Sequence, residues 1–374
     1  MIIQGVLEEA DPDTKHDSFI RLARNNYMPD IEDPYMSSYQ IEKFGLQTGD
    51  LIECEILPPK RNKDKKSEYY RVVKILLVNG NEVNVSNDKV PFSKQKPVNP
   101  YEHLVLEHDP NELSTRIIDL IAPIGKGQRS LIIAPAYSGK TTTLKNIAAG
   151  IEYNYPDIEL TFLLIDERPE EVTDVEESIN GQVISSTFDM QPQQHIRIAE
   201  LVIEKAKRQA ENGKDIVILL DSITRLVRAY NIMAPKSGKM LSGGISASAF
   251  FKPRQFLGSA RKLRNSGSIT IISTVLVETE SRGDQVIYEE LKGTGNSELH
   301  LDRDLLDSRI YPTIDINQSK TRREELLFDE VTLNVSWALR EALNKMKPAE
   351  ALLSVRERIK QVQTNDQLIT TMRK

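Results

Sequence analysis

Residues 131–144 (LIIAPAYSGKTTTL) constrain the fold of this 374-residue chain more than any other stretch. An apolar strand runs into a tight turn, and Gly139-Lys140-Thr141 opens a helix. The spacing is that of G-x-x-x-x-G-K-[ST], with Ala134 in place of the first glycine. Such a turn directs backbone N–H groups and the positive end of a helix dipole at the phosphates of a nucleotide. We therefore predict a phosphate-binding loop; the alternative is a turn that contains Gly-Lys-Thr by chance.

Each residue type in this loop has a chemical role in binding phosphates. Gly139 lets the backbone approach closely, Lys140 reaches the terminal phosphates, and the Thr141 hydroxyl is a ligand for Mg²⁺. The residues predicted to contact the nucleotide are Ala136, Tyr137, Ser138, Gly139, Lys140, Thr141 and Thr142.

Two carboxylates follow apolar strands, where an open α/β sheet binds its ligand. Asp221 closes the run 217–220, and we expect it to hold Mg²⁺, partly through water. Glu167 follows the strand that ends at Asp166, and it is placed to polarise the water that attacks the γ-phosphate. Acidic residues also cap helices after strands, which is the alternative for both. Together with the phosphate loop, they favour a nucleotide site.

The pattern of apolar, polar and proline residues divides the chain into three parts. Residues 1–88 contain short alternating segments, which predict a small β-barrel. Residues 89–112 are polar and proline-bearing and suit a linker. In residues 113–374 apolar strands alternate with helical segments, which predicts a parallel sheet covered by helices on its faces, and the last 45 or so residues are helical.

Aromatic and basic residues are interleaved in the predicted barrel. They could form a platform on which nucleic-acid bases stack, or the aromatics could fill the barrel core while the basic residues are solvated; the sequence leaves both open. The residues concerned are Phe19, Tyr35, Tyr39, Tyr69 and Tyr70, with Arg21, Lys43 and Lys60.

Composition narrows the class of protein. A single cysteine, Cys54, excludes an intramolecular disulfide, and five histidines with one thiol offer no zinc-ligand pattern. We find neither a signal peptide nor an apolar run long enough to span a membrane, so we expect a cytoplasmic protein. The net charge of −6 does not point to nucleic acid, although it says little about a local basic groove.

Four long motifs resemble the bacterial transcription termination factor Rho family. They are LLIDERPEEVT (163–173), LLDSITRL (219–226), VIYEELKGTGN (286–296) and TRREELL (321–327). The resemblance runs nearly end to end. It implies a hexameric ring-shaped RNA helicase with an oligonucleotide-binding (OB) barrel followed by a RecA-like motor, which uses ATP and Mg²⁺ to move 5′-to-3′ along single-stranded RNA. RNA polymerase and transcription elongation factors are the partners that the family implies.

The resemblance also assigns residues. It implies that Glu167 is the catalytic glutamate, with Arg168 as a phosphate-sensing arginine beside it, and that Arg322 is the arginine finger reaching a neighbour's γ-phosphate. Tyr311 matches the aromatic residue that packs on adenine. Lys239 and Arg282 belong to two loops that family members project into the central pore; without the family, both would be read as residues of solvated surface loops.

Three positions depart from the family pattern. Tyr137 stands where the phosphate loop usually carries a basic residue, which puts the rate of ATP turnover in question. Asp17 occupies the first of two aromatic positions in the barrel, which removes a stacking face and repels phosphates. Arg282 replaces a usual lysine and keeps the charge. We expect RNA capture that is weaker or less selective for pyrimidines.

Three functions are compatible with these residues. The first is an ATP-driven RNA translocase that dislodges RNA from transcribing polymerase. The second is a nucleotide-gated RNA-binding regulatory ring with weak or altered hydrolysis. The third is a RecA-like ATPase of the ATP-synthase subunit type, against which the pore-loop and TRREELL matches argue.

Overall fold

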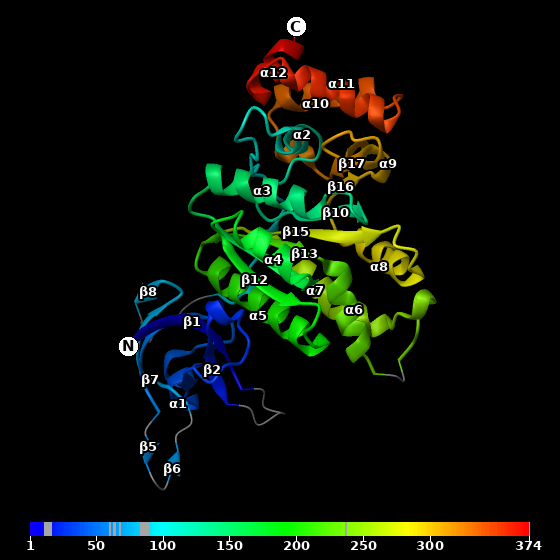
Figure 1. Ribbon diagram of the computed structural model, residues 1–374. Helices are drawn as coiled ribbons and strands as arrows, with labels where there is room; N and C mark the ends of the chain where they lie inside the picture. Colours follow the sequence, from blue (N-terminus) through cyan, green and yellow to red (C-terminus); the bar gives the residue numbers. More distant parts are fainter. Residues whose placement is uncertain are drawn as a thin grey trace.

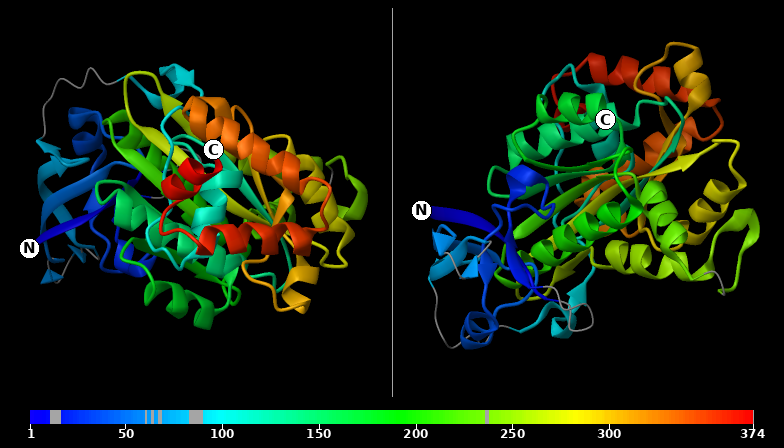
Figure 2. Two further views of the ribbon diagram at one scale, coloured as in Figure 1. Left: turned by 90° about the horizontal axis from the view of Figure 1, so that it is seen from above. Right: turned by 60° about the horizontal axis from the view of Figure 1, so that its bottom comes forward.

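The computed structural model describes residues 1–10, 17–59, 61–62, 65–66, 69–82, 90–235 and 238–373. A small β-barrel at the N-terminus lies beside a larger α/β unit, and a group of helices at the C-terminus covers that unit on the side away from the barrel (Figure 1). Figure 2 shows the same order of parts from two further directions, with the N-terminal strand at one end of the molecule.

The N-terminal sheet closes into a barrel, as the alternating segments predicted. Its strand order is β3-β2-β1-β4-β7-β8, and a parallel pairing of Tyr35 with Arg71 joins β3 to β7. Leu7, Ile20 and Ile52 lie in its core. Its elements are β1 (Ile2–Glu8), β2 (Ser18–Arg21), β3 (Tyr35–Met36), α1 (Ser38–Phe44), β4 (Leu51–Leu57), β7 (Arg71–Val78) and β8 (Asn81–Glu82), with β5 (Arg61–Asn62) paired to β6 (Lys65–Lys66).

The α/β unit is built on a sheet of order β12-β11-β13-β15-β10-β16-β17. The first six strands run parallel, and β17 pairs antiparallel with β16. The strands are β10 (Arg129–Pro135), β11 (Glu159–Glu167), β12 (Gln182–Thr187), β13 (Asp215–Asp221), β15 (Ser268–Val277), β16 (Ser297–Leu301) and β17 (Ile314–Thr321). The predicted parallel sheet is therefore confirmed.

Helices cover both faces of this sheet, so its central strands are apolar on both sides. Ile132 and Ala134 of β10 face one core, while Leu131 and Ile133 face the other. On the first face lie α2 (Leu113–Ile121), α3 (Lys140–Asn154), α4 (Pro169–Glu176), α9 (Arg303–Asp307), α10 (Glu330–Leu343), α11 (Pro348–Lys360) and α12 (Asn365–Met372). On the second lie α5 (Pro192–Glu211), α6 (Ile223–Met233), α7 (Phe251–Gly258) and α8 (Arg282–Lys292).

The stretch expected to be a linker packs closely against the α/β unit. Within it, β9 (Pro97–Val98) pairs with β14 (Arg261–Leu263), which in turn pairs with β15. Leu104 and Leu106 are fully buried in the first core. This part of the chain therefore fixes itself to the sheet in addition to joining two units.

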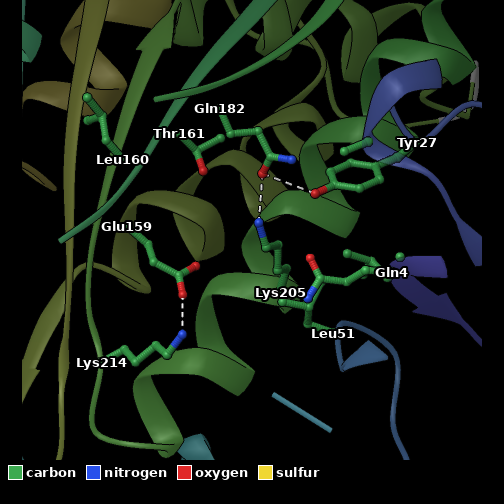
Figure 3. Close-up of a pocket in the computed structure, with 12 residues that line it drawn as sticks. Gln4, Tyr27, Leu51, Glu159, Leu160, Thr161, Gln182, Lys205 and Lys214 are labelled. Atoms are coloured by element: carbon green, nitrogen blue, oxygen red, sulfur yellow. Dashed lines mark hydrogen bonds and ion pairs between the residues drawn. The ribbon is translucent and has the colours of Figure 1, made fainter. Parts of the chain in front are cut away.

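The barrel and the α/β unit share a cavity of about 400 Å³ that is lined by residues of both. Figure 3 shows Tyr27 and Lys205 reaching the same side-chain oxygen of Gln182, from the barrel and from α5 respectively. The distances to Gln182 Oε1 are 3.1 Å from the Tyr27 hydroxyl and 2.7 Å from Lys205 Nζ. Because Tyr27 is 1% exposed, its contact with Gln182 helps to hold the barrel against the start of β12. Among the helices of the described residues, none is long and apolar enough to cross a membrane.

Candidate active site

The phosphate loop has the predicted strand–turn–helix geometry. Strand β10 ends at Pro135 and α3 begins at Lys140, with Tyr137 (φ +66°) and Gly139 (φ +85°) in the left-handed region between them. The first backbone bond within this helix runs from Thr143 N to Gly139 O, 2.9 Å. The N–H groups of residues 140–142 therefore precede the helical ladder and point out of its N-terminus. A Cβ on Gly139 would have Thr313 Oγ1, at 3.9 Å, as its nearest neighbour, so the space in front of the loop is open.

Lys140 lies at the centre of the site. Its Nζ is 2.6 Å from Asp221 Oδ2 and 2.9 Å from Glu167 Oε1, so the structure brings together the three residues predicted from separate motifs. Thr141 Oγ1 also donates to Asp221 Oδ2, at 3.1 Å. Burial lowers the pKa of Lys140, but the charges of Asp221 and Glu167 outweigh burial and leave that pKa raised. The lysine is therefore cationic where the terminal phosphates of a nucleotide would lie.

Glu167 is directed into the site by an irregularity in β11. The register between β11 and β12 shifts between Ile165 and Glu167, and Asp166 has a φ of +58°. A bulge of this kind re-aims the next side chain, and the Glu167 residue is only 1% exposed. Burial, then repulsion from Asp221, raises the pKa of Glu167 to about 7, against the opposing charges of Lys140 and Arg225. A carboxylate with a pKa near neutrality suits a general base.

The sequence interpretation missed two residues that orient these groups, Arg225 and Thr274. Arg225 Nη1 donates to Asp166 Oδ2 at 2.9 Å, and its Nε lies 3.2 Å from Glu167 Oε1. Thr274 Oγ1, in the middle of β15, donates to Asp221 Oδ1 at 2.7 Å. The sequence contains a feature that could have identified each of them: Arg225 follows Asp221 by one helical turn, and Thr274 interrupts an apolar strand.

The donor set fits Mg²⁺. The Thr141 hydroxyl and the Asp221 carboxylate are oxygen donors 3.1 Å apart, and Asp221 is fully buried. Mg²⁺ prefers oxygen ligands and usually takes only one or two from the protein, the rest coming from phosphates and water. In the described part of the chain, no group of three or more His, Cys, Asp or Glu side chains could hold a metal ion.

The predicted finger residue, Arg322, lies where the parallel strands begin, at the opposite end from the phosphate loop. We call this end of the sheet the amino edge. Arg322 N donates to Asn296 O at 2.9 Å, and Asn296 Oδ1 accepts from Arg129 N at 2.8 Å, so Arg322 lies beside the first residue of β10. The phosphate loop follows the last residue of that strand. Seven residues of strand span about 20 Å. The exposed Arg322 is therefore remote from the Lys140 of its own chain.

The two other residues predicted to contact the nucleotide are Arg168 and Tyr311. Both lie near the end of the sheet where the parallel strands finish, which we call the carboxyl edge. Arg168 is exposed and occupies the N-cap position of α4, directly after Glu167, without a capping hydrogen bond from its side chain. Tyr311 is 49% exposed. It lies two residues before Thr313, whose Oγ1 donates to Ser138 O in the phosphate loop at 2.5 Å. The backbone around Tyr311 is thereby fastened to this loop.

The two predicted pore loops contact each other. Lys239 and Arg282 are both exposed. Gly243, in the loop of Lys239, has a φ of +71°, and a Cβ there would lie 2.7 Å from the carbonyl carbon of Arg282. Asp284, the third residue of α8, pairs with Arg228 of α6 at 2.5 Å. The helix that carries Arg225 therefore also contacts the second of these loops.

The barrel gathers part of the predicted aromatic platform. The ring of Phe19 packs edge-on against Tyr35 and Tyr69, with centroids 6.2 and 5.0 Å apart. Arg21 lies 4.9 Å from the Phe19 centroid, but the residue is buried and its guanidinium pairs with Glu8 (2.5 Å) and Asp33 (2.7 Å). It supports Phe19 and is not a free surface cation. Lys60 lies outside the described residues.

The outer aromatics of the barrel divide between surface and core. Tyr39 is 70% exposed and Lys43 Nζ lies 5.8 Å from its ring centroid. Tyr70 packs partly against the barrel core. The core alternative therefore holds for Tyr70, whereas Tyr39 faces solvent.

Comparison with known families separates the same two units. Residues 3–84 match the model of the Rho termination factor RNA-binding domain. Residues 114–321 match the ATP synthase alpha/beta family nucleotide-binding domain. Curated relatives named transcription termination factor Rho match over almost the whole chain. The protein of Neisseria gonorrhoeae is 49% identical over 95% of this chain and 84% of its own length. The chain belongs to the transcription termination factor Rho family.

Other Rho relatives show a similar extent of match. The Aquifex aeolicus protein is 46% identical over 100% of this chain and 85% of its own length, and the Bacillus subtilis protein is 49% identical over 92% and 79%. Membership of the Rho family confirms the resemblance seen in the motifs. It also confirms the fold class, an OB-type barrel followed by a RecA-like nucleotide-binding unit of the ATPase type.

Solved structures with low identity show the same fold. The assembled ATPase EscN from the type III secretion system of enteropathogenic E. coli superposes with a TM-score of 0.62 at 18% identity, covering 99% of this chain and 96% of that one. A prototypical ATPase from the type III secretion system of pathogenic bacteria gives 0.61 at 21% identity, over 74% and 85%. The motor fold of this Rho family member is thus shared with ATPases outside the family.

Proposed function

We propose that the protein is an ATP-dependent 5′-to-3′ RNA helicase that terminates transcription by pulling nascent RNA through a homohexameric ring. The observation that carries this proposal is the division of one ATP site between two edges of the sheet. Lys140, Glu167 and Asp221 meet at the carboxyl edge, and Arg322 lies at the amino edge. Termination itself is supported by the relatives, which are named for it.

The carboxyl edge supplies most of the chemistry of hydrolysis. Residues 136–142 surround the phosphates, Lys140 neutralises their charge, and Glu167 accepts a proton from the attacking water. Mg²⁺ held by Thr141 and Asp221 would shield the charge of the phosphates. Arg168, exposed beside Glu167, is placed to sense the γ-phosphate, and Tyr311 to pack on adenine. Electrostatic groups of this kind usually provide the largest part of the rate enhancement in phosphoryl transfer.

The amino edge requires a second subunit. Because Arg322 lies about a strand length from its own phosphate loop, it can act only on the nucleotide of a neighbour. A contact between opposite edges of identical chains is head-to-tail, and it closes into a ring if the rotation allows. This geometry supports the homohexamer proposed from the family.

RNA would be bound first on the barrel and then in the pore. Phe19, with Tyr35 beside it, offers a stacking face, and Lys60 begins the basic stretch KRNKDKK at residues 60–66. Lys239 and Arg282 are exposed on loops that touch each other. Helix α6 carries both Arg225, which contacts Glu167, and Arg228, which pairs with Asp284 beside the second loop. A movement of this helix on ATP hydrolysis would therefore also move the loop that contacts RNA.

The remaining expectations from the family are part of the same proposal. We propose a division into an RNA-binding unit (1–88), a connecting segment (89–112) and a motor (113–374). We propose RNA polymerase and elongation factors as partners and the cytoplasm as the location. None of these depends on the geometry of the nucleotide site.

The decisive experiment measures ATP hydrolysis with and without poly(C), poly(U) and mixed-sequence RNA. We expect RNA to stimulate turnover several-fold, and Glu167→Gln to abolish it without preventing nucleotide binding. RNA binding with unstimulated, marginal turnover would instead favour the nucleotide-gated regulatory ring. Brisk hydrolysis that is indifferent to RNA would favour a motor of the ATP-synthase type.

A further inference from the structure

A group of three arginines at the amino edge of the sheet makes no ion pair with any carboxylate of the described residues. Within the described residues, the guanidinium of Arg129 donates only to the backbone oxygens of Thr294 and Ala260, each at 3.0 Å. Arg261 donates to Gly258 O at 2.5 Å and lies over the ring of Phe92. The third is Arg322. We call Arg129, Arg261 and Arg322 the arginine cluster.

The arginine cluster lies at a cavity. Arg129 and Arg261 line a space of about 440 Å³, together with Asn296, Gly127 and residues 97–100. Burial lowers the pKa of Arg129, and the charges of Arg261 and Arg322 lower it further. The three cations are thus close enough to repel one another, and two of them are partly withdrawn from water. Such a cavity favours an anion from outside the chain.

Two neighbouring lysines, in contrast to the arginine cluster, form ion pairs with carboxylates of the same chain. Lys126 lies 2.7 Å from Asp215, and Lys262 lies 3.2 Å from Glu102. These lysines are three residues and one residue away from Arg129 and Arg261 in sequence. Acidic residues are more numerous than basic ones, 55 against 49, so the cluster is not a consequence of a basic composition.

An acidic surface lies at the opposite edge. Helix α4 starts beside Glu167 and carries Glu170 and Glu171 in its first turn. Glu171 lies 3.9 Å from Lys140, which places this turn next to the phosphates. Glu170 is exposed and makes no ion pair within the described residues. If Arg322 of one subunit reaches the nucleotide of the next, the rest of the cluster approaches this turn.

We propose that the cavity lined by Arg129 and Arg261 receives the Glu170–Glu171 turn of a second copy of this chain, forming a charge clamp beside the shared ATP site. The clamp rests on the proposed function in that it uses the same head-to-tail contact. It sets the distance between the subunits, and so determines how far Arg322 extends towards the neighbour's phosphates.

The test is a charge swap in the full-length chain, measured as the ring-to-monomer distribution by mass photometry at several protein concentrations. We expect Arg261→Glu alone and Glu170→Arg alone each to raise the concentration at which rings form by tenfold or more, because each places like charges together. The double variant should restore assembly. Arg264→Glu and Glu341→Arg, at exposed positions outside the cavity and α4, are the matched controls and should assemble normally.

Two readouts keep the result interpretable. Thermal melts of each variant identify misfolding, and Arg261→Gln, which removes the charge but not the hydrogen-bonding capacity, should weaken assembly to a smaller extent. Assembly is measured without ATP or RNA, so it does not depend on whether RNA stimulates hydrolysis. Normal assembly of both single variants, or a double variant no better than either, would overturn the clamp. So would a raised KM for ATP with assembly unchanged, since the cluster would then bind the neighbour's phosphates.

Discussion

The guanidinium of Arg225 lies 3.2 Å from Oε1 of Glu167, the carboxylate proposed as the catalytic base. This contact opposes burial and the charge of Asp221, which together raise the pKa of Glu167 to about 7. The base is active only when ionised. We therefore expect kcat/KM for RNA-stimulated hydrolysis to rise with pH through about 7 and then level off.

Replacing Arg225 by Gln should move that rise to higher pH. The substitution removes a positive charge that lowers the pKa of Glu167, so a higher pH is needed to ionise the base. The measurement is kcat/KM against pH for the two proteins in parallel, which cancels the titration of ATP itself. A profile that stays in place or moves towards acid would contradict the assignment of Glu167 as the titrating group.

Removing the hydroxyl of Thr274 should impair hydrolysis. Thr274→Val keeps the shape but leaves Asp221 Oδ1, which is buried, without its donor. An unsatisfied buried acceptor costs about 1–3 kcal/mol, so we expect kcat/KM to fall by roughly 5- to 150-fold. Ser273→Ala is the matched control on the same strand, because the Ser273 hydroxyl is buried without a hydrogen-bond partner. Equal losses in both variants would show that the strand, and not the bond to Asp221, is responsible.

Tyr137 offers a gain-of-function test. Its side chain is 78% exposed in the phosphate loop, so a lysine would fit and would bring a cation to the phosphates. An exposed charge contributes about 0.2–1 kcal/mol, so Tyr137→Lys should lower KM for ATP by up to about fivefold, and added salt should reduce the gain. Tyr137→Phe should leave KM near the parent value. An unchanged KM in the lysine variant would show that position 137 does not contact the triphosphate.

The barrel prediction concerns stacking and charge separately. Phe19→Ala should weaken binding of a short oligo(C) by about 5- to 150-fold, since stacking on an aromatic ring contributes about 1–3 kcal/mol per base. Asp17→Asn removes the repulsion of phosphates, and Asp17→Phe also adds a ring. We expect affinity to increase in that order, measured by fluorescence anisotropy at two salt concentrations. Equal affinities of the Asn and Phe variants would mean that residue 17 does not face a base.

Local patterns predicted the strands, the phosphate loop and the residues that follow strands, because spacing in the chain determines these directly. Lys140, Glu167 and Asp221 could be named in advance, since each ends or follows an apolar run. Their supporting contacts could not. Thr274 and Asp221 are 53 residues apart, and only the register of β13 against β15 brings them together.

The sequence also did not predict which residues outside the apolar runs are buried. Arg21 has the composition of a phosphate contact, yet it is enclosed by Glu8 and Asp33. Likewise, the prolines of residues 89–112 suggested a plain linker, although Leu104 and Leu106 enter the core. Both outcomes depend on which groups the folded barrel and sheet place nearby, and no short window of sequence contains that information.

Glu167 and Arg322 lie at opposite ends of the parallel strands of one sheet. With the proposed roles of base and finger, each subunit would carry the base for one reaction and the finger for another, and no subunit would be a whole catalyst. Two inactive variants, Glu167→Gln and Arg322→Ala, should therefore regain part of the ATP hydrolysis when they are unfolded and reassembled together. About a quarter of randomly formed junctions between subunits would combine an intact base with an intact finger. ATP hydrolysis would then be a property of each junction between two subunits and not of the single chain.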